Sequence, residues 1–234
     1  MSLLLLTAIL PAGCGKSDDT ANSTPAPRAV PSGSATIHGL VFFDGTAPAI
    51  KVVSPPNYWA TATDPTIIVN PNGTLKDVLV YLQDGPPGDG GGPPVILDQR
   101  NATYVPHVLA LQVGQPLIIR SSDAHFHNVH IDASVNRQQN YPMQEPGDLP
   151  PITFKVPEFF QIKCDVHPWM DCQVGVFDHP YFAVTGDDGS FVIHNVPPGN
   201  YTLAAKHERY GDLTQQITLT DQQTTEVTFR YKQP

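Results

Sequence analysis

The sequence predicts an all-β protein built from two β-sandwiches. Proline occurs 25 times and glycine 18 times among the 234 residues, and long apolar helical stretches are missing. The apolar pieces are short and bounded by Gly, Pro or Asp, a pattern typical of many strands joined by turns. A chain of this length is sufficient for one large domain or for two sandwiches of about 100 residues each.

The first residues, MSLLLLTAILPAGC, predict an export signal over residues 1–14. The apolar run from Leu3 to Leu10 is too short to span a bilayer as a mature helix. The segment LPAGC resembles a bacterial lipobox, which implies lipidation of Cys14; plain export and an unprocessed N-terminus stay open as alternatives. Residues 15–34 are rich in Pro, Ser and Thr and predict a flexible linker. We therefore expect a protein of the bacterial cell envelope, periplasmic or on the outer surface, whose membrane attachment is the lipid anchor alone.

Residues 35–87 predict the first strands of the folded part. The segments ATIHGLVFFDG and TLKDVLVYLQDG each read as a strand that ends in an Asp-Gly turn. Between them, residues 51–66 show no clear element. Two assignments stay open here: both strands belong to a second sandwich, or DVLVYLQ is the first strand of the central domain.

Residues 88–180 predict a small Greek-key sandwich. After the loop DGPPGDGGGPP come VILD, then TYVPHVLALQVGQPLIIRSSD, HFHNVHIDA and EFFQIKCDVHPWMDCQVGVFDH, each a set of short apolar pieces. The proline-bearing stretch from Ala133 to Val156 is expected to be irregular. It lies between the segments HFHNVHIDA and EFFQIKCDVHPWMDCQVGVFDH, so it is close enough in sequence to cover or reshape a site that they form.

Two motifs in this central region contain the residue types that hold copper. HNVH occupies 127–130, and CDVHPWM occupies 164–170. A soft thiolate, two imidazoles and a weak thioether suit both Cu(II) and Cu(I). One short loop between two strands can present the three donors of C-x2-H-x2-M, so the fourth must come from a neighbouring strand.

These motifs resemble those of amicyanin and related plastocyanin-like blue copper proteins, the cupredoxins, over about residues 95 to 178. The resemblance implies a cupredoxin sandwich for 88–180 and places Asn128 where it would pin the ligand loop by hydrogen bonds. It also implies that the ring edge of His167 reaches solvent inside an apolar rim. One type 1 copper ion would be bound by His127, Cys164, His167 and Met170.

For each proposed copper ligand, a purely structural role is the alternative. For Cys172 and most of the remaining histidines, a structural or surface role is the expectation. Taken alone, Cys164 would more often be a buried thiol and Met170 core filler, but their joint spacing with His167 favours ligation. Cys172 has the parity of an inward-facing strand residue. Among the other histidines we expect a surface residue or substitute ligand at His125, and a core residue or one that supports a ligand at His130. We expect a packing residue at His107, with a metal role as the alternative, and surface residues at His179, His194 and His207.

The last region, 181–234, alternates between apolar and polar residues with a period of two. This holds in SFVIHN, NYTLAAK and TEVTFRY, with turns at GDDGS, VPPGN and RYGD. The run VTGDDGSFVIHNVPPGNYTLAAKHERYG resembles the carboxypeptidase regulatory-like module, a smaller, Ig-like or transthyretin-like sandwich. Such modules begin with a Gly-Val strand and an Asp-Gly turn, as in HGLVFFDG. The resemblance implies a split module, 35–87 plus 181–234, with the copper domain inserted in a loop.

Charge and motifs narrow the function. With 22 Asp and Glu against 13 Lys and Arg, the net charge is −9, and no Lys/Arg cluster is present that would indicate a nucleic-acid partner. No hydrolase motif, second His-rich copper motif or C-x-x-C-H haem site appears, so we expect no enzyme. The prediction is single-electron transfer between exported redox partners such as a c-type cytochrome or a dehydrogenase. The alternatives are a copper-handling lipoprotein and a surface interaction protein with a structural metal site.

Overall fold

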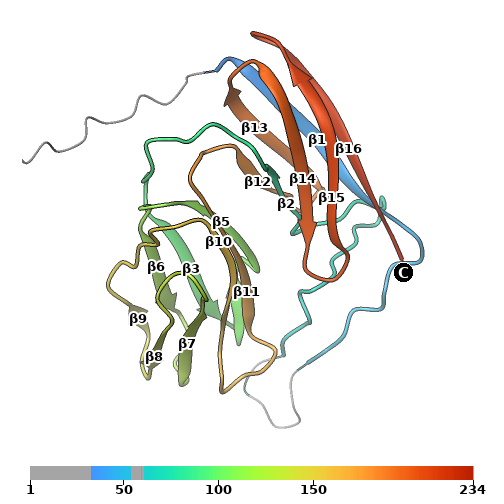
Figure 1. Ribbon diagram of the computed structural model, residues 1–234. Helices are drawn as coiled ribbons and strands as arrows, with labels where there is room; N and C mark the ends of the chain where they lie inside the picture. Colours follow the sequence, from blue (N-terminus) through green and yellow to red (C-terminus); the bar gives the residue numbers. More distant parts are fainter. Residues whose placement is uncertain (1–32, 54–58, 60, 234) are drawn as a thin grey trace, which may run out of the picture.

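The computed structural model describes residues 33–53, 59 and 61–233, and every regular element in this part of the chain is a β-strand (Figure 1). The predicted signal at 1–14, Cys14 and most of the predicted linker lie outside the described residues. In the described part, no helix has the length and apolar character needed to cross a membrane. The strands form four sheets, and these face each other in pairs as two sandwiches.

The terminal sandwich combines strands from both ends of the chain. Its sheets have the orders β13-β1-β16 and β12-β2-β14-β15, and β1 pairs antiparallel with β13 and parallel with β16. In β1, buried and half-buried residues alternate, because one face of the strand lies on the core. Both strands predicted within 35–87 therefore pair with C-terminal strands. The bounds are β1 (Ala35–Asp44), β2 (Leu79–Leu82), β12 (Phe182–Val184), β13 (Ser190–Val196), β14 (Gly199–His207), β15 (Gly211–Leu219) and β16 (Thr224–Lys232).

The central sandwich consists of a five-stranded sheet, β5-β11-β10-β7-β8, and a four-stranded sheet, β4-β3-β6-β9. Side chains from both sheets form one core, in which Leu97, Ile119 and Ile162 are fully buried. The bounds are β3 (Val95–Arg100), β4 (Thr103–Val105), β5 (Val108–Gln112), β6 (Leu117–Ser121), β7 (His127–Asp132), β8 (Gln139–Met143), β9 (Gly147–Asp148), β10 (Glu158–Lys163) and β11 (Asp171–Phe177).

The stretch from Ala133 to Val156 is more ordered than its prolines predict. It contains β8, which pairs antiparallel with β7 from His127↔Met143 onward, and β9, which pairs with β6. Pro142 lies in β8, and β8 is an edge strand, where a residue without an N–H is tolerated. The expectation of a wholly irregular segment is wrong: it extends both sheets of the central sandwich.

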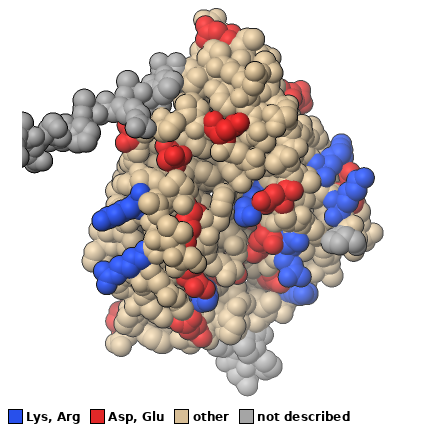
Figure 2. Space-filling model, viewed as in Figure 1, with Lys and Arg blue, Asp and Glu red and all other residues tan. Residues whose placement is uncertain are grey.

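The two sandwiches pack against each other through a small apolar cluster. It contains Leu79 and Tyr81 of β2, Val108 of β5, Phe177 of β11 and Ala204 of β14. All four residues of β2 are buried, because this strand is covered by its own core on one face and by the central sandwich on the other. On the face shown in Figure 2, acidic and basic side chains are interspersed over both sandwiches.

Candidate metal centre

A tight loop between β10 and β11 carries three of the four predicted ligands. The two strands pair antiparallel up to Lys163↔Asp171. The backbone N–H of Cys164 donates to the carbonyl of Met170 (3.0 Å), and the N–H of Met170 donates to the carbonyl of His167 (2.8 Å). These bonds hold Cys164 and Met170 across from each other at the base of the loop and His167 in the turn above them.

The fourth predicted ligand starts the neighbouring strand β7, which pairs with β10. Nδ1 of His127 lies 2.9 Å from Nδ1 of His167, and the Cys164 Sγ lies 3.5 Å from the same His167 atom. The three potential ligand atoms are all within 4.8 Å of one another. Metal–nitrogen bonds of about 2.0 Å and metal–sulfur bonds of about 2.3 Å separate ligand atoms by a little over 3 Å. One ion therefore fits between these side chains.

The predicted ligands are buried, and burial favours the neutral form of both imidazoles. His127, Cys164, His167 and Met170 are each at most 2 % exposed. Burial lowers the pKa of both His127 and His167, because the interior disfavours the charged imidazolium. A neutral imidazole keeps a lone pair for a metal, so protons compete weakly at this site.

Asp123 orients the first imidazole. Nε2 of His127 lies 3.0 Å from Asp123 Oδ2, so this nitrogen donates and Nδ1 faces the centre. The carboxylate also accepts from the backbone N–H groups of Asn101 (2.8 Å) and Ala102 (3.0 Å), which fixes its position. A carboxylate behind a ligating histidine sets the tautomer of the ring and raises its basicity.

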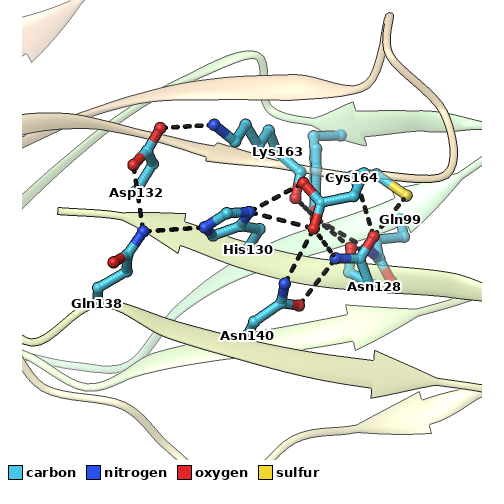
Figure 3. A network of polar contacts seen from close by, with 10 residues as sticks. Gln99, Asn128, His130, Asp132, Gln138, Asn140, Lys163 and Cys164 are labelled. Atoms are coloured by element: carbon cyan, nitrogen blue, oxygen red, sulfur yellow. Dashed lines mark hydrogen bonds and ion pairs between the residues drawn. The ribbon is translucent and has the colours of Figure 1, made fainter.

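Asn128 connects β7 to the loop 164–170 between β10 and β11 (Figure 3). Its Oδ1 accepts from the backbone N–H of Asp165 (2.7 Å) and from the thiol of Cys164 (3.3 Å). Its Nδ2 donates to Asp165 Oδ2 and to Asn140 Oδ1, both at 2.8 Å. The side-chain amide thus bonds to the backbone of the loop 164–170 and to two polar side chains beside it.

Several supporting residues have no motif that identifies them in advance. Asp165 also accepts from Asn140 Nδ2 (2.9 Å) and from Nδ1 of His130 (2.9 Å), and the bond from His130 lowers the pKa of the Asp165 carboxyl. Trp59 stacks on the ring of His125, with centroids 3.9 Å apart. Asp123 lies four residues before His127, and Asp165 directly follows Cys164. This proximity in sequence to a predicted ligand is the one signal that could have indicated either aspartate.

The expected exposure of His167 is wrong. Its residue surface is 2 % exposed, and its ring packs against those of His127 and Trp169, with centroid distances of 4.8 and 5.5 Å. The indole N–H of Trp169 donates to the carbonyl of Ala102 (2.9 Å), which anchors this ring on the neighbouring sheet.

Two histidines expected at the surface are also buried, namely His179 and His207, whereas His194 is exposed. Burial lowers the pKa of His207 to about 4. Cys172 is fully buried in β11 as a free thiol, in line with its strand parity. The sequence could not reveal the burial of the two histidines, because the residues that cover them come from other strands.

Comparisons with known proteins agree with both resemblances. Residues 171–232 match the model of the carboxypeptidase regulatory-like domain, as the C-terminal run predicted. This match begins at β11, a strand that hydrogen-bonds within the central sandwich. Among curated proteins, no sequence matches this chain.

Solved copper proteins are among the structural neighbours. A Cu(I) structure of an amicyanin variant is 25 % identical and covers 36 % of this chain and 81 % of its own, with a TM-score of 0.33. A second Cu(I) amicyanin variant is 22 % identical and covers 42 % of this chain and 97 % of its own, with the same TM-score. The copper-containing nitrite reductase from Thermus scotoductus SA-01 is 21 % identical, also with a TM-score of 0.33; the match covers 36 % of this chain and 22 % of the reductase. The predicted all-β sandwich class is confirmed, and the predicted likeness to amicyanin is confirmed as a partial structural resemblance.

Proposed function

We propose that this protein binds one copper ion of the type 1 kind at His127, Cys164, His167 and Met170 and transfers single electrons. The observation that carries the proposal is the convergence of a buried thiol with two imidazole Nδ1 atoms within 4.8 Å. A bound copper ion would accept an electron from one redox partner as Cu(II) and pass it to another as Cu(I). A thiolate, two imidazoles and a thioether form the donor set that suits this alternation.

The surrounding residues support electron transfer because they fix the donors in place. Asp123 holds the His127 ring, and Asn128 holds the backbone of the loop 164–170 through the N–H of Asp165. Donors that keep their positions in both oxidation states require little reorganisation when an electron arrives or leaves. A buried, apolar setting also excludes water, which strengthens these hydrogen bonds.

A redox partner would dock on the surface beside the centre, where two apolar side chains are exposed. Phe126 and Val166, each next to a ligand in sequence, are 45 % and 46 % exposed. Small apolar patches rimmed by polar groups are typical of transient interfaces. The partner would be an exported redox protein such as a c-type cytochrome or a dehydrogenase, in the cell envelope. In this role the protein acts on no substrate of its own.

The test is spectroscopy of the copper-loaded protein beside two cysteine variants. Cys164→Ser removes the proposed thiolate and should abolish the intense blue charge-transfer band. Cys172→Ser alters the other buried free thiol and should keep it. A reversible one-electron redox titration of the unaltered protein then tests for transfer. If Cys164→Ser retains the blue band, or if reduction expels the copper, the proposal is wrong.

A further inference from the structure

A cavity of about 630 Å³ lies at the side of the central sandwich, and none of the predicted copper ligands lines it. Its walls are formed by two segments, 135–141 and 149–156. The first leads into β8, at the edge of the five-stranded sheet, and the second follows β9, at the edge of the four-stranded sheet. Cavities that take small organic molecules have volumes of roughly 300–1,000 Å³, so this one is large enough for such a ligand.

The inner surface of this cavity is apolar. Ile152 and Phe154 line it and are buried. Tyr141 and Leu149 also line it, are partly buried, and pack against the core of the central sandwich. Farther out, the lining residue Val135 is 69 % exposed. An apolar group that entered here would be removed from water on several sides, which is favourable.

Hydrogen bonds hold the two walls in place without a ligand. Asn136 joins them, because its Oδ1 accepts from the backbone N–H of Lys155 (2.9 Å) and its Nδ2 donates to the carbonyl of Val156 (2.9 Å). The carboxylate of Glu158 accepts from the backbone N–H groups of Val135 (2.8 Å) and Asn136 (2.7 Å). A cavity whose walls are already ordered costs a ligand little conformational entropy.

The charged residues that line this cavity are both basic. Arg137 and Lys155 are exposed lining residues, and no Asp or Glu is among the described residues of the lining. Within the described part of the chain, no carboxylate forms an ion pair with either side chain, whereas Arg120 on the neighbouring strand β6 pairs with Asp148 (2.8 Å). In a protein of net charge −9, this place therefore favours an anion.

We propose that this cavity binds a small amphipathic anion, namely a carboxylate attached to an apolar chain or ring. The apolar part would lie against Tyr141, Leu149 and Ile152, and the carboxylate would face Arg137 and Lys155. A guanidinium group suits this ligand, because it can donate two parallel hydrogen bonds to one carboxylate. The cavity and the metal centre share no residue, so this proposal stands independently of electron transfer.

The experiment titrates two fluorescent dyes into the full protein. One is 8-anilinonaphthalene-1-sulfonate, an anion, and the other is N-phenyl-1-naphthylamine, which has the same ring systems without the sulfonate. The fluorescence of both dyes increases in apolar surroundings. We expect one equivalent of the anionic dye to bind. Added sodium chloride should weaken the binding of this dye and leave that of the uncharged dye unchanged, because salt screens charge interactions.

Variants separate the charged from the apolar part of the site. Arg137→Gln and Lys155→Gln should each weaken the anionic dye about threefold, and together about tenfold, with little effect on the uncharged dye. Val156→Trp enlarges a side chain of the lining and should weaken both dyes. The matched control is Lys232→Gln, because Lys232 is an exposed residue of β16 in the other sandwich; it should bind both dyes as the parent does.

Octanoate and octylamine test the chemistry of the ligand, since they have the same chain and opposite charges. Octanoate should displace the anionic dye, and octylamine should not. If Val156→Trp does not fold, as judged by circular dichroism, Val135→Trp at the more exposed lining position takes its place. The proposal is overturned if the parent binds neither dye or if the tryptophan variant keeps the parent's affinity. It is also overturned if the Gln variants bind the anionic dye as tightly as the control, or if octylamine displaces it as well as octanoate.

Discussion

Asn128 uses both ends of its side-chain amide to join β7, the strand that begins at His127, to the loop 164–170 between β10 and β11. It accepts two hydrogen bonds at Oδ1 and donates two from Nδ2, and it is 7 % exposed. Removing the amide would leave the Asp165 N–H and the thiol of Cys164 without this acceptor. Each buried group left unsatisfied costs about 1–3 kcal/mol.

We therefore predict that Asn128→Ala lowers the free energy of unfolding by about 2–4 kcal/mol. It should also weaken copper retention, because the loop loses its anchor. Urea denaturation and dialysis of the copper-loaded protein measure both effects. The control is Asn140→Ala, since Asn140 is exposed and its loss should cost less. Equal losses in the two variants would contradict the anchoring role.

His179 lies at the junction of the two sandwiches in a setting that requires a neutral ring. Its Nε2 donates to the carbonyl of Leu82 (2.9 Å), and its Nδ1 accepts from the backbone N–H of Tyr181 (3.1 Å). Burial lowers the pKa of His179, although the nearby Asp178 and Asp84 act in the opposite direction. A second proton would have to replace the bond from Tyr181.

This depressed pKa predicts a loss of stability in acid. Above the unfolded value of about 6.5 the ring is neutral in both states, and its contribution is complete. As pH falls below 6.5, the unfolded chain takes up the proton first, so stability decreases by up to about 1.4 kcal/mol per pH unit until the lower folded pKa is reached.

His179→Gln provides the test, because glutamine keeps a donor and an acceptor but does not titrate. Urea denaturation at several pH values between 7.5 and 5 should show a shallower loss of stability in the variant than in the parent. Parallel curves for the two proteins would show that His179 does not titrate in this window.

At the scale of elements, strand β1 fills the middle of its sheet, between β13 and β16. Gly39 pairs with Phe191 of β13 and with Val227 of β16. A Cβ atom at this position would lie 1.9 Å from the carbonyl oxygen of Val227 and 2.9 Å from the ring of Phe191. The backbone of β16 cannot withdraw without breaking its parallel ladder with β1, so a glycine is required.

We predict that Gly39→Ala destabilises the protein by about 3 kcal/mol or more, near the upper end of the cost of overpacking. Gly186→Ala is the matched control. Its added Cβ would have its nearest contact at 3.6 Å, on a side-chain oxygen of Asp188, and should change stability by about 0.5 kcal/mol or less. Thermal unfolding by circular dichroism distinguishes the two. A mild effect at Gly39 would show that β1 and β16 can separate slightly.

At the scale of the whole molecule, aromatic rings from both sandwiches pack together at the interface between them. Phe177 is 5 % exposed, and its ring lies 5.0 Å from that of Tyr81 and 4.9 Å from that of Phe182. The residue ends β11 in the central sandwich, whereas Tyr81 and Phe182 belong to the terminal one. We infer that the two sandwiches unfold together, because neither keeps these ring contacts alone.

Phe177→Ala should therefore reduce stability by about 3–5 kcal/mol and divide one thermal transition into two. Differential scanning calorimetry measures both effects. Val192→Ala truncates an exposed apolar residue of β13 and should leave a single transition. A Phe177→Ala protein that still unfolds in one step would show that other contacts, such as those of Leu79, are sufficient to couple the sandwiches.

The sequence by itself determined the features that depend on neighbours along the chain. Period-two alternation and frequent turns indicated strands, and these are properties of a few consecutive residues. The grouping of Cys164, His167 and Met170 was also foreseeable, because one loop carries all three. Tertiary structure decided what depends on distant segments: the parallel pairing of β1 with β16, the burial of His167 and His179, and the hydrogen bonds that fix Asp123 behind the ring of His127. The physical reason is that a side chain's burial and partners are set by the segment that packs over it, and no local pattern specifies which segment that is.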